Sequence, residues 1–577
     1  MSKRNLFLAI TLLVPIALFG GVELALRAAG MGRLEPLFVA VPDAPGYLQP
    51  NPAAVQRFFP DPRQAPAVSI DTTWFPERKA EGTLRIFVLG ESSAAGFPYG
   101  RWASPAALLQ QRLQRAYPDR RVEVVNTAMA AVTSYVLLDF AEEIIEREPD
   151  AVVIYTGHNE YLGIGGVGSS LASARSPAVA RTIARLRRLH LYRSLEQLLA
   201  SVGGGNELPR HDGTLMARVA AERSIPLDSP LYRRGLEQFR GNLDRLLRKY
   251  REAGVEVFIG TLASNERDQP PFASASPDNV VASAIARFRE AQRLDAAGDF
   301  AAARVEYLAA KDRDALRFRA PESFNELIRE LATASGARLV DVQQALASAS
   351  RDGIIGADLM LEHVHPNAEG YFRLASAWFP AMTEWLGPPS VAVDDETARR
   401  EMPLTEVDRL HGEYRVAVLK NDWPFVPVRR ATQLPAATNR IEEIAQSWFA
   451  GQSSWMQAMN DALAAYQRAG NHDEAARVAV NLADAIVTSA EAQYTAGRLL
   501  LRAESPARGL HYLQRAVDLD AASVEIRLSL AQAQFMLGDV AGSIATLEAI
   551  LAAHPEDSRA QYWLDEMRSQ QDAPPPP

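Results

Sequence analysis

A serine stands at a position where a buried strand is expected to end. Residues 84–89 form an apolar run that predicts this strand, and the sequence continues as GESS at residues 90–93. A serine in a strand-to-helix turn lies exposed at the rim of a sheet, close to the backbone N–H groups of the helix start. Ser92 is therefore a candidate nucleophile. The motif is not the G-x-S-x-G elbow, which disfavours an α/β-hydrolase.

Three further polar segments could complete a catalytic site around this serine. NTAMAA at residues 126–131 follows the second predicted strand, and GHNE at residues 157–160 follows the third. EHVHPN at residues 362–367 lies late in the chain, just before a predicted helix. Parallel sheets bind their ligands at the carboxyl ends of the strands, so we expect these segments to meet Ser92 there.

The order and spacing of the four segments resemble those of the SGNH hydrolase superfamily, whose members are also called GDSL esterases and lipases. The resemblance extends over residues 81–388, and the combination of four segments is far more specific than any one of them. The variants GESS, GHNE and EHVHPN look closest to bacterial, membrane-anchored members that also carry tetratricopeptide repeats.

The resemblance implies a role for each matching residue. Ser92 would attack the acyl carbonyl, and His365 would take its proton and return it to the leaving alkoxide. Glu362 would orient the imidazole of His365 and stabilise its protonated form. The oxyanion hole would consist of the backbone N–H groups of Ser92 and Ala131 and the side-chain amide of Asn159.

Three residues depart from the family pattern. Glu91 replaces the usual Asp of the first segment, where it is expected to shape the turn. Glu362 replaces the usual Asp of the triad, although Glu serves as the third triad member in other hydrolases. Ala131 stands where the family has an oxyanion-hole Gly. Its backbone N–H is correctly placed only if its φ is negative or if the strain of a positive φ is tolerated.

Four residues beside the triad are candidates for contacting the substrate: Gly157, His158, Glu160 and His363. His363 and His365 could instead be two ligands of a metal ion, with Glu362 or His158 completing the site. No further ligand cluster is apparent in the sequence, and a metal site would leave Ser92 unexplained. We therefore favour a serine mechanism that needs neither metal nor cofactor.

The segments between these motifs alternate between strand and helix patterns. Apolar runs predict strands at residues 84–89, 122–125, 151–155, 255–260 and 338–340. Amphipathic segments predict helices at residues 105–117, 136–147 and 231–251. This alternation predicts an α/β fold, a three-layer, flavodoxin-like domain with a central parallel sheet over residues 81–388. Helical insertions are expected at about residues 163–230 and 282–312.

The C-terminal part of the chain repeats with a period of 34 residues. At this spacing Ala469, Ala503 and Leu537 align with one another. The residues directly after them, Gly470, Glu504 and Gly538, align in the same way. A period of this length is typical of tetratricopeptide repeats, which are paired helices that bind protein partners. We therefore expect an α-helical repeat domain at residues 451–570, a linker at 389–450 and a disordered tail at 571–577.

The N-terminus resembles a transmembrane signal anchor at residues 1–30. Lys3 and Arg4 precede an apolar run at residues 6–22, which is close to the lower limit for crossing a hydrocarbon core of about 30 Å. The positive flank predicts a cytoplasmic N-terminus and a single pass through the inner membrane of a bacterium, with the bulk in the periplasm. A cleaved signal peptide is the alternative. The Pro-rich residues 31–80 are expected to form an extended stalk and lead-in that packs on the next domain.

The composition excludes several other classes of function. The chain contains no cysteine, so it has no disulfides, thiolate metal sites or Cys nucleophile. A formal net charge of −9 argues against nucleic acid as the main partner. We predict an extracytoplasmic serine hydrolase that cleaves or transfers esters on a carbohydrate or lipid. The second hypothesis is a non-catalytic assembly factor that binds a glycan or lipid in the same pocket and uses the repeats as a scaffold.

Overall fold

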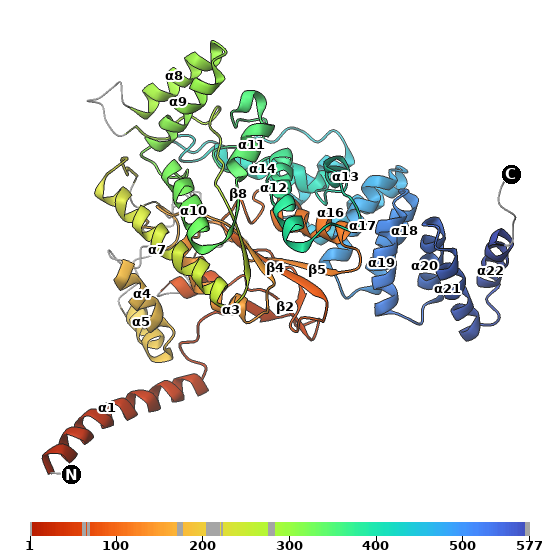
Figure 1. Cartoon of the computed structure of the whole chain (residues 1–577), viewed down its shortest axis with the longest axis horizontal. Helices are drawn as coiled ribbons and strands as arrows, with labels where there is room; N and C mark the ends of the chain where they lie inside the picture. The colour runs from red at the N-terminus through yellow and green to blue at the C-terminus, as the bar shows by residue number, and fades with distance from the viewer. Residues whose placement is uncertain are drawn as a thin grey trace. The chain divides into compact units, whose positions relative to one another are not determined.

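The computed structural model describes residues 3–59, 65, 70–169, 177–202, 220, 223–274 and 283–571 (Figure 1). The chain divides into two compact units. The first comprises Met1–Phe97, Val122–Trp385 and Val418–Ala431. The second comprises Pro98–Arg121, Leu386–Ala417 and Thr432–Pro577. Part of the expected hydrolase segment thus belongs to the second unit, and part of the expected linker belongs to the first.

The first unit is built on a five-stranded sheet. In spatial order the strands are β5 (Arg121–Asn126), β4 (Thr83–Gly90), β6 (Ala151–Tyr155), β7 (Glu256–Gly260) and β8 (Arg338–Val340). The neighbours β4–β6, β6–β7 and β7–β8 are parallel, as predicted for an α/β fold. Strands β4 and β6 are buried at every position, which is typical of parallel strands covered on both faces.

Five helices of the same region carry or support the polar segments: α3 (Ser134–Ile145), α7 (Pro230–Glu252), α10 (Glu322–Ser335), α11 (Val342–Ala349) and α12 (Ala368–Leu386). Helix α3 packs against α7, and α7 packs against α10. The ring of Trp378 on α12 lies so close to β7 that a Cβ on Gly260 would meet it at 2.7 Å. Only glycine therefore allows α12 to approach the strand this closely.

The segments expected as insertions contain helices, joined by turns among the described residues. Residues 163–230 include α4 (Pro177–Arg187) and α5 (His190–Val202), while 170–176, 203–219 and 221–222 lie outside the described residues. Residues 284–312 form a hairpin of α8 (Ala284–Ala296) and α9 (Phe300–Asp312). Gly298 supplies the positive φ of the turn, and Asp299 caps α9 by accepting the N–H of Ala302.

The Pro-rich lead-in is folded rather than an extended stalk. It contains a three-stranded antiparallel sheet of β1 (Phe38–Ala40), β2 (Tyr47–Pro50) and β3 (Phe75–Pro76), and the 3-10 helix η1 (Ala54–Phe58). Phe38 and Phe75 pack edge-on against each other and against Phe87 of β4. Arg57 forms ion pairs with Asp139 and Glu143 of α3. Burial of these rings accounts for the difference from a stalk.

The N-terminal segment forms helix α1 (Lys3–Ala28), drawn in red in Figure 1. The sequence predicted a membrane-spanning helix here, whereas no helix within the described part of the chain is both long and apolar enough to cross a bilayer. Charges interrupt its C-terminal end. Glu23 forms an ion pair with Arg27 at 2.7 Å, and its carboxylate accepts the backbone N–H groups of His190 and Leu191.

The second unit contains the repeats as successive helices: α16 (Trp455–Arg468), α17 (His472–Ala485), α18 (Ala490–Arg502), α19 (Pro506–Leu519), α20 (Val524–Met536), α21 (Val540–Ala553) and α22 (Ser558–Gln571). Each of these helices packs against the next. The aligned positions Gly470, Glu504 and Gly538 each follow a helix end and adopt positive φ, of 69°, 53° and 81°. The 34-residue period therefore corresponds to a repeated left-handed turn between paired helices.

The expected linker is largely helical. It contains α13 (Asp395–Arg400), α14 (Glu406–Lys420) and α15 (Arg440–Phe449). Val407 and Tyr414 of α14 and Ile444 of α15 are buried in the same hydrophobic core as the first repeat helices. The second unit also includes η3 (Gly100–Ala103) and α2 (Pro105–Ala116). Within residues 389–450, helices α14 and α15 thus pack their apolar side chains against the first repeat helices.

Candidate active site

The first polar segment forms a tight turn at the carboxyl end of β4. A Cβ on Gly90 would lie 2.2 Å from the carbonyl oxygen of Tyr155, so only glycine allows the strands to approach at this point. After Ser92 the chain continues as further turns, in which Phe97 donates its N–H to the carbonyl of Ser92, and not directly as a helix. Ser92 is half-buried at this rim.

Glu91 holds the first and third polar segments together. Its carboxylate accepts the Thr156 hydroxyl at 2.9 Å and the backbone N–H groups of Gly157 and Asn159 at 2.7 and 3.0 Å. Burial raises the pKa of Glu91 to about 8, while these three donors oppose that shift. The sequence assigned Glu91 only to the turn, and the structure shows that it also orients the segment containing Asn159.

Ser92, His365 and Glu362 form one hydrogen-bonded chain. The Nε2 atom of His365 lies 2.7 Å from the hydroxyl oxygen of Ser92, 273 residues away in sequence. Its Nδ1 faces Oε1 of Glu362, which also accepts the backbone N–H of His365 at 3.0 Å. Because Nε2 accepts the serine hydroxyl, the imidazole proton belongs on Nδ1, where it is donated to the carboxylate. Glu362 and His365 are both buried.

Three other contacts help to set the position of the late loop relative to Ser92. The hydroxyl of the neighbouring Ser93 donates to the carbonyl of Val364 at 3.0 Å. The ring of Phe97 lies 4.5 Å from the ring of His365, centroid to centroid, and the hydroxyl of Tyr371 on α12 donates to the carbonyl of Phe97 at 2.6 Å. The histidine is therefore held both by its own loop and by the turn that follows the serine.

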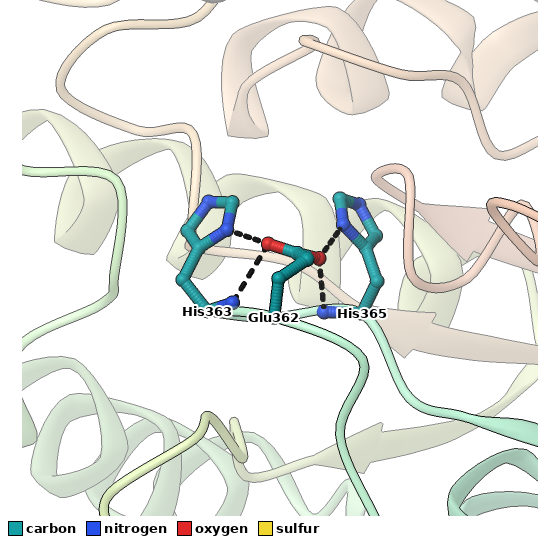
Figure 2. A group of neighbouring side chains, drawn as sticks. All are labelled: Glu362, His363 and His365. Carbon is teal, nitrogen blue, oxygen red and sulfur yellow. Dashed lines mark hydrogen bonds and ion pairs between the residues drawn. The ribbon is translucent and has the colours of Figure 1, made fainter. Parts of the chain in front are cut away.

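Figure 2 shows that a second histidine also contacts Glu362. The Nδ1 and backbone N–H of His363 both face Oε2 of the carboxylate. One ligand atom from each of Glu362, His363 and His365 lies within 4.8 Å of the others, so these three residues could hold a metal ion. Both Nδ1 atoms, however, face carboxylate oxygens as hydrogen-bond donors. Metal binding at Nδ1 would require these nitrogens to lose their protons.

The expected oxyanion-hole residues lie in the loops after β4, β5 and β6. Ala131 has a φ of 59°, which is the strained left-handed conformation that the sequence raised as one alternative. Its carbonyl accepts the N–H of Ile164 at 2.7 Å. The N–H of Met129 donates to the carbonyl of Gly90, which joins the second segment to the first. Asn159 is half-buried, with its backbone N–H bound to Glu91.

Two of the residues expected to contact substrate, His158 and Glu160, are buried and have different hydrogen-bond partners. His158 accepts the N–H of Ala320 at Nδ1, and burial lowers its pKa to about 3, so it is neutral. Glu160 accepts the N–H and hydroxyl of Ser134 and the side-chain amide of Gln238, and burial raises its pKa to about 7. These bonds occupy both oxygens of Glu160 within the interior.

Gly157 also has a structural reason for its residue type. Its φ is 146°, and a Cβ there would lie 2.5 Å from the side chain of Leu262. Sequence reasoning missed the residues of Val418–Ala431, although this segment belongs to the same unit as the site. Its Phe425 ring lies 5.5 Å from the ring of His363. The sequence carries no catalytic motif in that segment, and only folding brings it to the late loop.

Two family models match parts of the chain. Residues 88–373 match the model of the GDSL-like lipase/acylhydrolase family, and residues 500–564 match a tetratricopeptide repeat. The chain carries a GDSL-like lipase/acylhydrolase domain. Its C-terminal helices are tetratricopeptide repeats, as the 34-residue period predicted. The GDSL-like match includes all four polar segments, from the end of β4 to the loop of His365.

Several solved structures are similar to the GDSL-like domain. A lipase/acylhydrolase from Enterococcus faecalis has 14% identity, with 54% of this chain and 100% of that chain covered and a TM-score of 0.28. A catalytic mutant of an acetylxylan esterase from Geobacillus stearothermophilus has 14% identity, 54% and 99% coverage and a TM-score of 0.29. An esterase from Pseudoalteromonas sp. has 13% identity, 52% and 98% coverage and a TM-score of 0.25. No curated protein matches the chain.

Proposed function

We propose that the GDSL-like domain is a serine esterase that hydrolyses carboxylic esters, or transfers their acyl groups, on a carbohydrate or lipid. The observation that carries this proposal is the chain of contacts from Ser92 through His365 to Glu362, with 2.7 Å between the serine oxygen and Nε2. A nucleophile, a general base and an orienting carboxylate are the parts that acyl transfer through serine requires. The reaction needs no metal or cofactor.

The proposed reaction has two halves. Ser92 attacks the ester carbonyl while His365 takes the hydroxyl proton, and Glu362 stabilises the resulting imidazolium. His365 then returns the proton to the leaving alkoxide as the acyl–oxygen bond breaks, which leaves Ser92 acylated. In the second half, water or an acceptor hydroxyl attacks the acyl group and gives its proton to His365, and the serine leaves with that proton. Water gives hydrolysis and an acceptor hydroxyl gives acyl transfer.

The negative charge on the tetrahedral intermediate requires donors aimed at its oxygen. We assign these to the backbone N–H groups of Ser92 and Ala131 and to the side-chain amide of Asn159, which follow three adjacent strands. The Glu91 carboxylate supports this arrangement because it binds the backbone N–H of Asn159 at 3.0 Å. One such donor is typically worth about 3–4 kcal/mol of transition-state stabilisation.

The test is the turnover of a short-chain aryl acetate ester by the full-length protein. Ser92→Ala is expected to abolish turnover and labelling by a fluorophosphonate probe. Ser505→Ala is a matched control, because this serine begins helix α19 in the repeats without a side-chain capping bond. Wild-type protein that neither turns over the ester nor reacts with the probe would favour the second hypothesis, a non-catalytic glycan- or lipid-binding assembly factor.

We also propose that the domain acts outside the cytoplasm, at the inner membrane of a bacterium, and that the repeats bind a protein partner. The location is supported by the positively flanked apolar run at residues 6–22. Cell fractionation tests it, since deletion of residues 1–30 is expected to leave the protein in the cytoplasm. Recovery of the intact chain in the cytoplasmic fraction would contradict this location.

A further inference from the structure

The triad carboxylate of this chain is held on both of its oxygens by neighbouring histidines (Figure 2). Oε1 of Glu362 receives Nδ1 and the backbone N–H of His365. Oε2 receives Nδ1 of His363 and its backbone N–H, the latter at 2.7 Å. A carboxylate that accepts hydrogen bonds at both oxygens cannot rotate without breaking some of them. His363 therefore restricts the group that orients His365.

The ring of His363 is itself firmly packed. Its side chain is only 3% exposed. Three aromatic rings contact it edge-on, those of Phe272, Phe318 and Phe425, at centroid distances of 5.5, 6.2 and 5.5 Å. The carbonyl of His363 accepts the N–H of Asn265 at 2.9 Å. A side chain with so little freedom can position its neighbour without much further entropy cost.

The charge state of His363 suits a donor rather than a second base. Burial, together with the nearby His365, Arg319 and His158, lowers the pKa of His363 well below its ordinary value. The ring is therefore neutral and carries one proton, and the facing carboxylate places that proton on Nδ1. A neutral donor fixes the carboxylate while leaving its negative charge available to stabilise protonated His365.

The third triad residue is a Glu, and its longer side chain explains why a hydrogen bond from His363 would matter. Glu362 replaces an Asp in the pattern that the segment resembles, and Glu has one more methylene and one more rotatable bond than Asp. The extra torsion gives the carboxylate more orientations, of which only some present an oxygen to His365. Binding at Oε2 selects among them.

We propose that His363 is a positioning residue, whose Nδ1–H holds Glu362 in the orientation that presents Oε1 to His365. The inference rests on the proposed esterase function and deepens it. The His363 ring meets the His365 ring edge-on at 5.8 Å, but its hydrogen bonds to the triad go to Glu362. Its loss should therefore lower kcat and leave substrate binding unchanged.

The experiment compares two amides at position 363 in the full-length protein. The amide nitrogen of Asn lies close to the place of Nδ1, whereas that of Gln lies close to the place of Nε2. His363→Asn should therefore keep most of the activity on an aryl acetate ester. His363→Gln and His363→Leu should lower kcat by about 10-fold to 100-fold, as expected for a displaced catalytic group, with KM little changed.

The same pair of substitutions at His411 supplies the control. This histidine stacks on Trp448 at 3.5 Å in the second unit, so His411→Asn and His411→Gln change an aromatic packing contact without touching the triad. They should retain wild-type kcat. Thermal unfolding of every variant shows whether a loss of kcat accompanies a loss of folding.

The outcomes separate this inference from the proposed function. Wild-type kcat in His363→Gln and His363→Leu overturns the positioning role, even if Ser92→Ala is inactive. Equal losses in the Asn and Gln variants, in kcat or in stability, also overturn it, because they indicate packing alone. Activity that survives Ser92→Ala overturns the esterase proposal itself. Rescue by Asn but not by Gln, with KM unchanged, supports the positioning role.

Discussion

Ala131 in the first unit and Glu504 in the second unit adopt the same unusual backbone conformation. Both adopt left-handed φ, 59° and 53°, a conformation that glycine adopts far more readily than other residues. At the repeat turn, the equivalent Gly470 and Gly538 show that the conformation belongs to the helix connection itself. In the loop after β5, the same conformation occurs at Ala131, whose backbone N–H we assign to the proposed oxyanion hole. The same strain, about 1–2 kcal/mol for a residue other than glycine, thus occurs at a helix connection in the second unit and beside the proposed active site in the first.

Among the substitutions that test this comparison, the largest change in kcat is expected for Asn159→Ala in the first unit. Asn159→Ala removes the proposed side-chain donor and leaves the backbone N–H that binds Glu91. We expect kcat to fall by about 10²-fold to 10³-fold, because an oxyanion-hole donor stabilises the transition state. Steady-state kinetics on an aryl ester measure the change, and thermal unfolding is the control for folding. An unchanged kcat would show that the oxyanion hole has been assigned to the wrong residues.

The two units should also respond differently to pH. Burial raises the pKa of Glu91 to about 8 and that of Glu160 to about 7 in the first unit, and that of Asp408 to about 6 in the second. A carboxyl that holds its proton more tightly when folded contributes stability that is full below its unfolded pKa. This contribution is lost as pH rises through the folded pKa. The first unit should therefore lose stability up to about pH 8, and the second only up to about pH 6.

Calorimetry between about pH 5 and pH 9 would test this difference. The transition of the first unit should fall by roughly 5 °C or more, since a change of 1 kcal/mol shifts Tm by a few degrees. Glu160→Gln, which cannot ionise, should reduce that pH dependence and leave the second unit unaffected. A Tm that rises over this range, or an equal slope in the Glu160→Gln variant, would contradict the assignment.

Relief of strain in the catalytic unit should give a smaller effect. Ala131→Gly is expected to raise the free energy of unfolding by about 1 kcal/mol, because glycine adopts positive φ without steric cost. The backbone N–H is retained, so kcat should change little. Ala131→Val should have the opposite effect and lower the free energy of unfolding, because a β-branched residue is strongly disfavoured at this φ. Denaturant unfolding that ranks Ala131→Gly below wild type would argue that the alanine methyl group packs usefully.

The smallest change is expected in the repeats, where Glu504→Gly should stabilise the helix pair by up to about 1 kcal/mol. Gly538→Ala, at the equivalent turn of the next repeat, should destabilise it by a similar amount. Neither substitution should alter ester turnover. A change in kcat caused by Glu504→Gly would show that the repeat turn is coupled to the catalytic unit, and the contrast between the two strained residues would then fail.

Local patterns in the sequence were sufficient for much of the fold. Strands β4 and β6 are continuous apolar runs, and such runs identify buried parallel strands from their own composition. The spacing of Gly470, Glu504 and Gly538 identified the repeats, because each repeat carries the same turn at the same place. The resemblance of four segments was enough to nominate Ser92 and His365 as partners. These predictions depended on neighbouring residues or on motifs, not on burial.

Tertiary structure alone decided where the remaining polar residues act. Glu91 accepts hydrogen bonds from the third segment, and Glu160 accepts them from Ser134 and Gln238. His363 contacts Oε2 of Glu362, the oxygen that does not face His365. These roles depend on partners supplied by other strands and loops, and on burial that changes which charge state is stable. By itself the sequence determined the strands of the main sheet, the repeats and the residue types that could react. Only folding, which brings Ser92 within 2.7 Å of His365 across 273 residues, decided which of them meet.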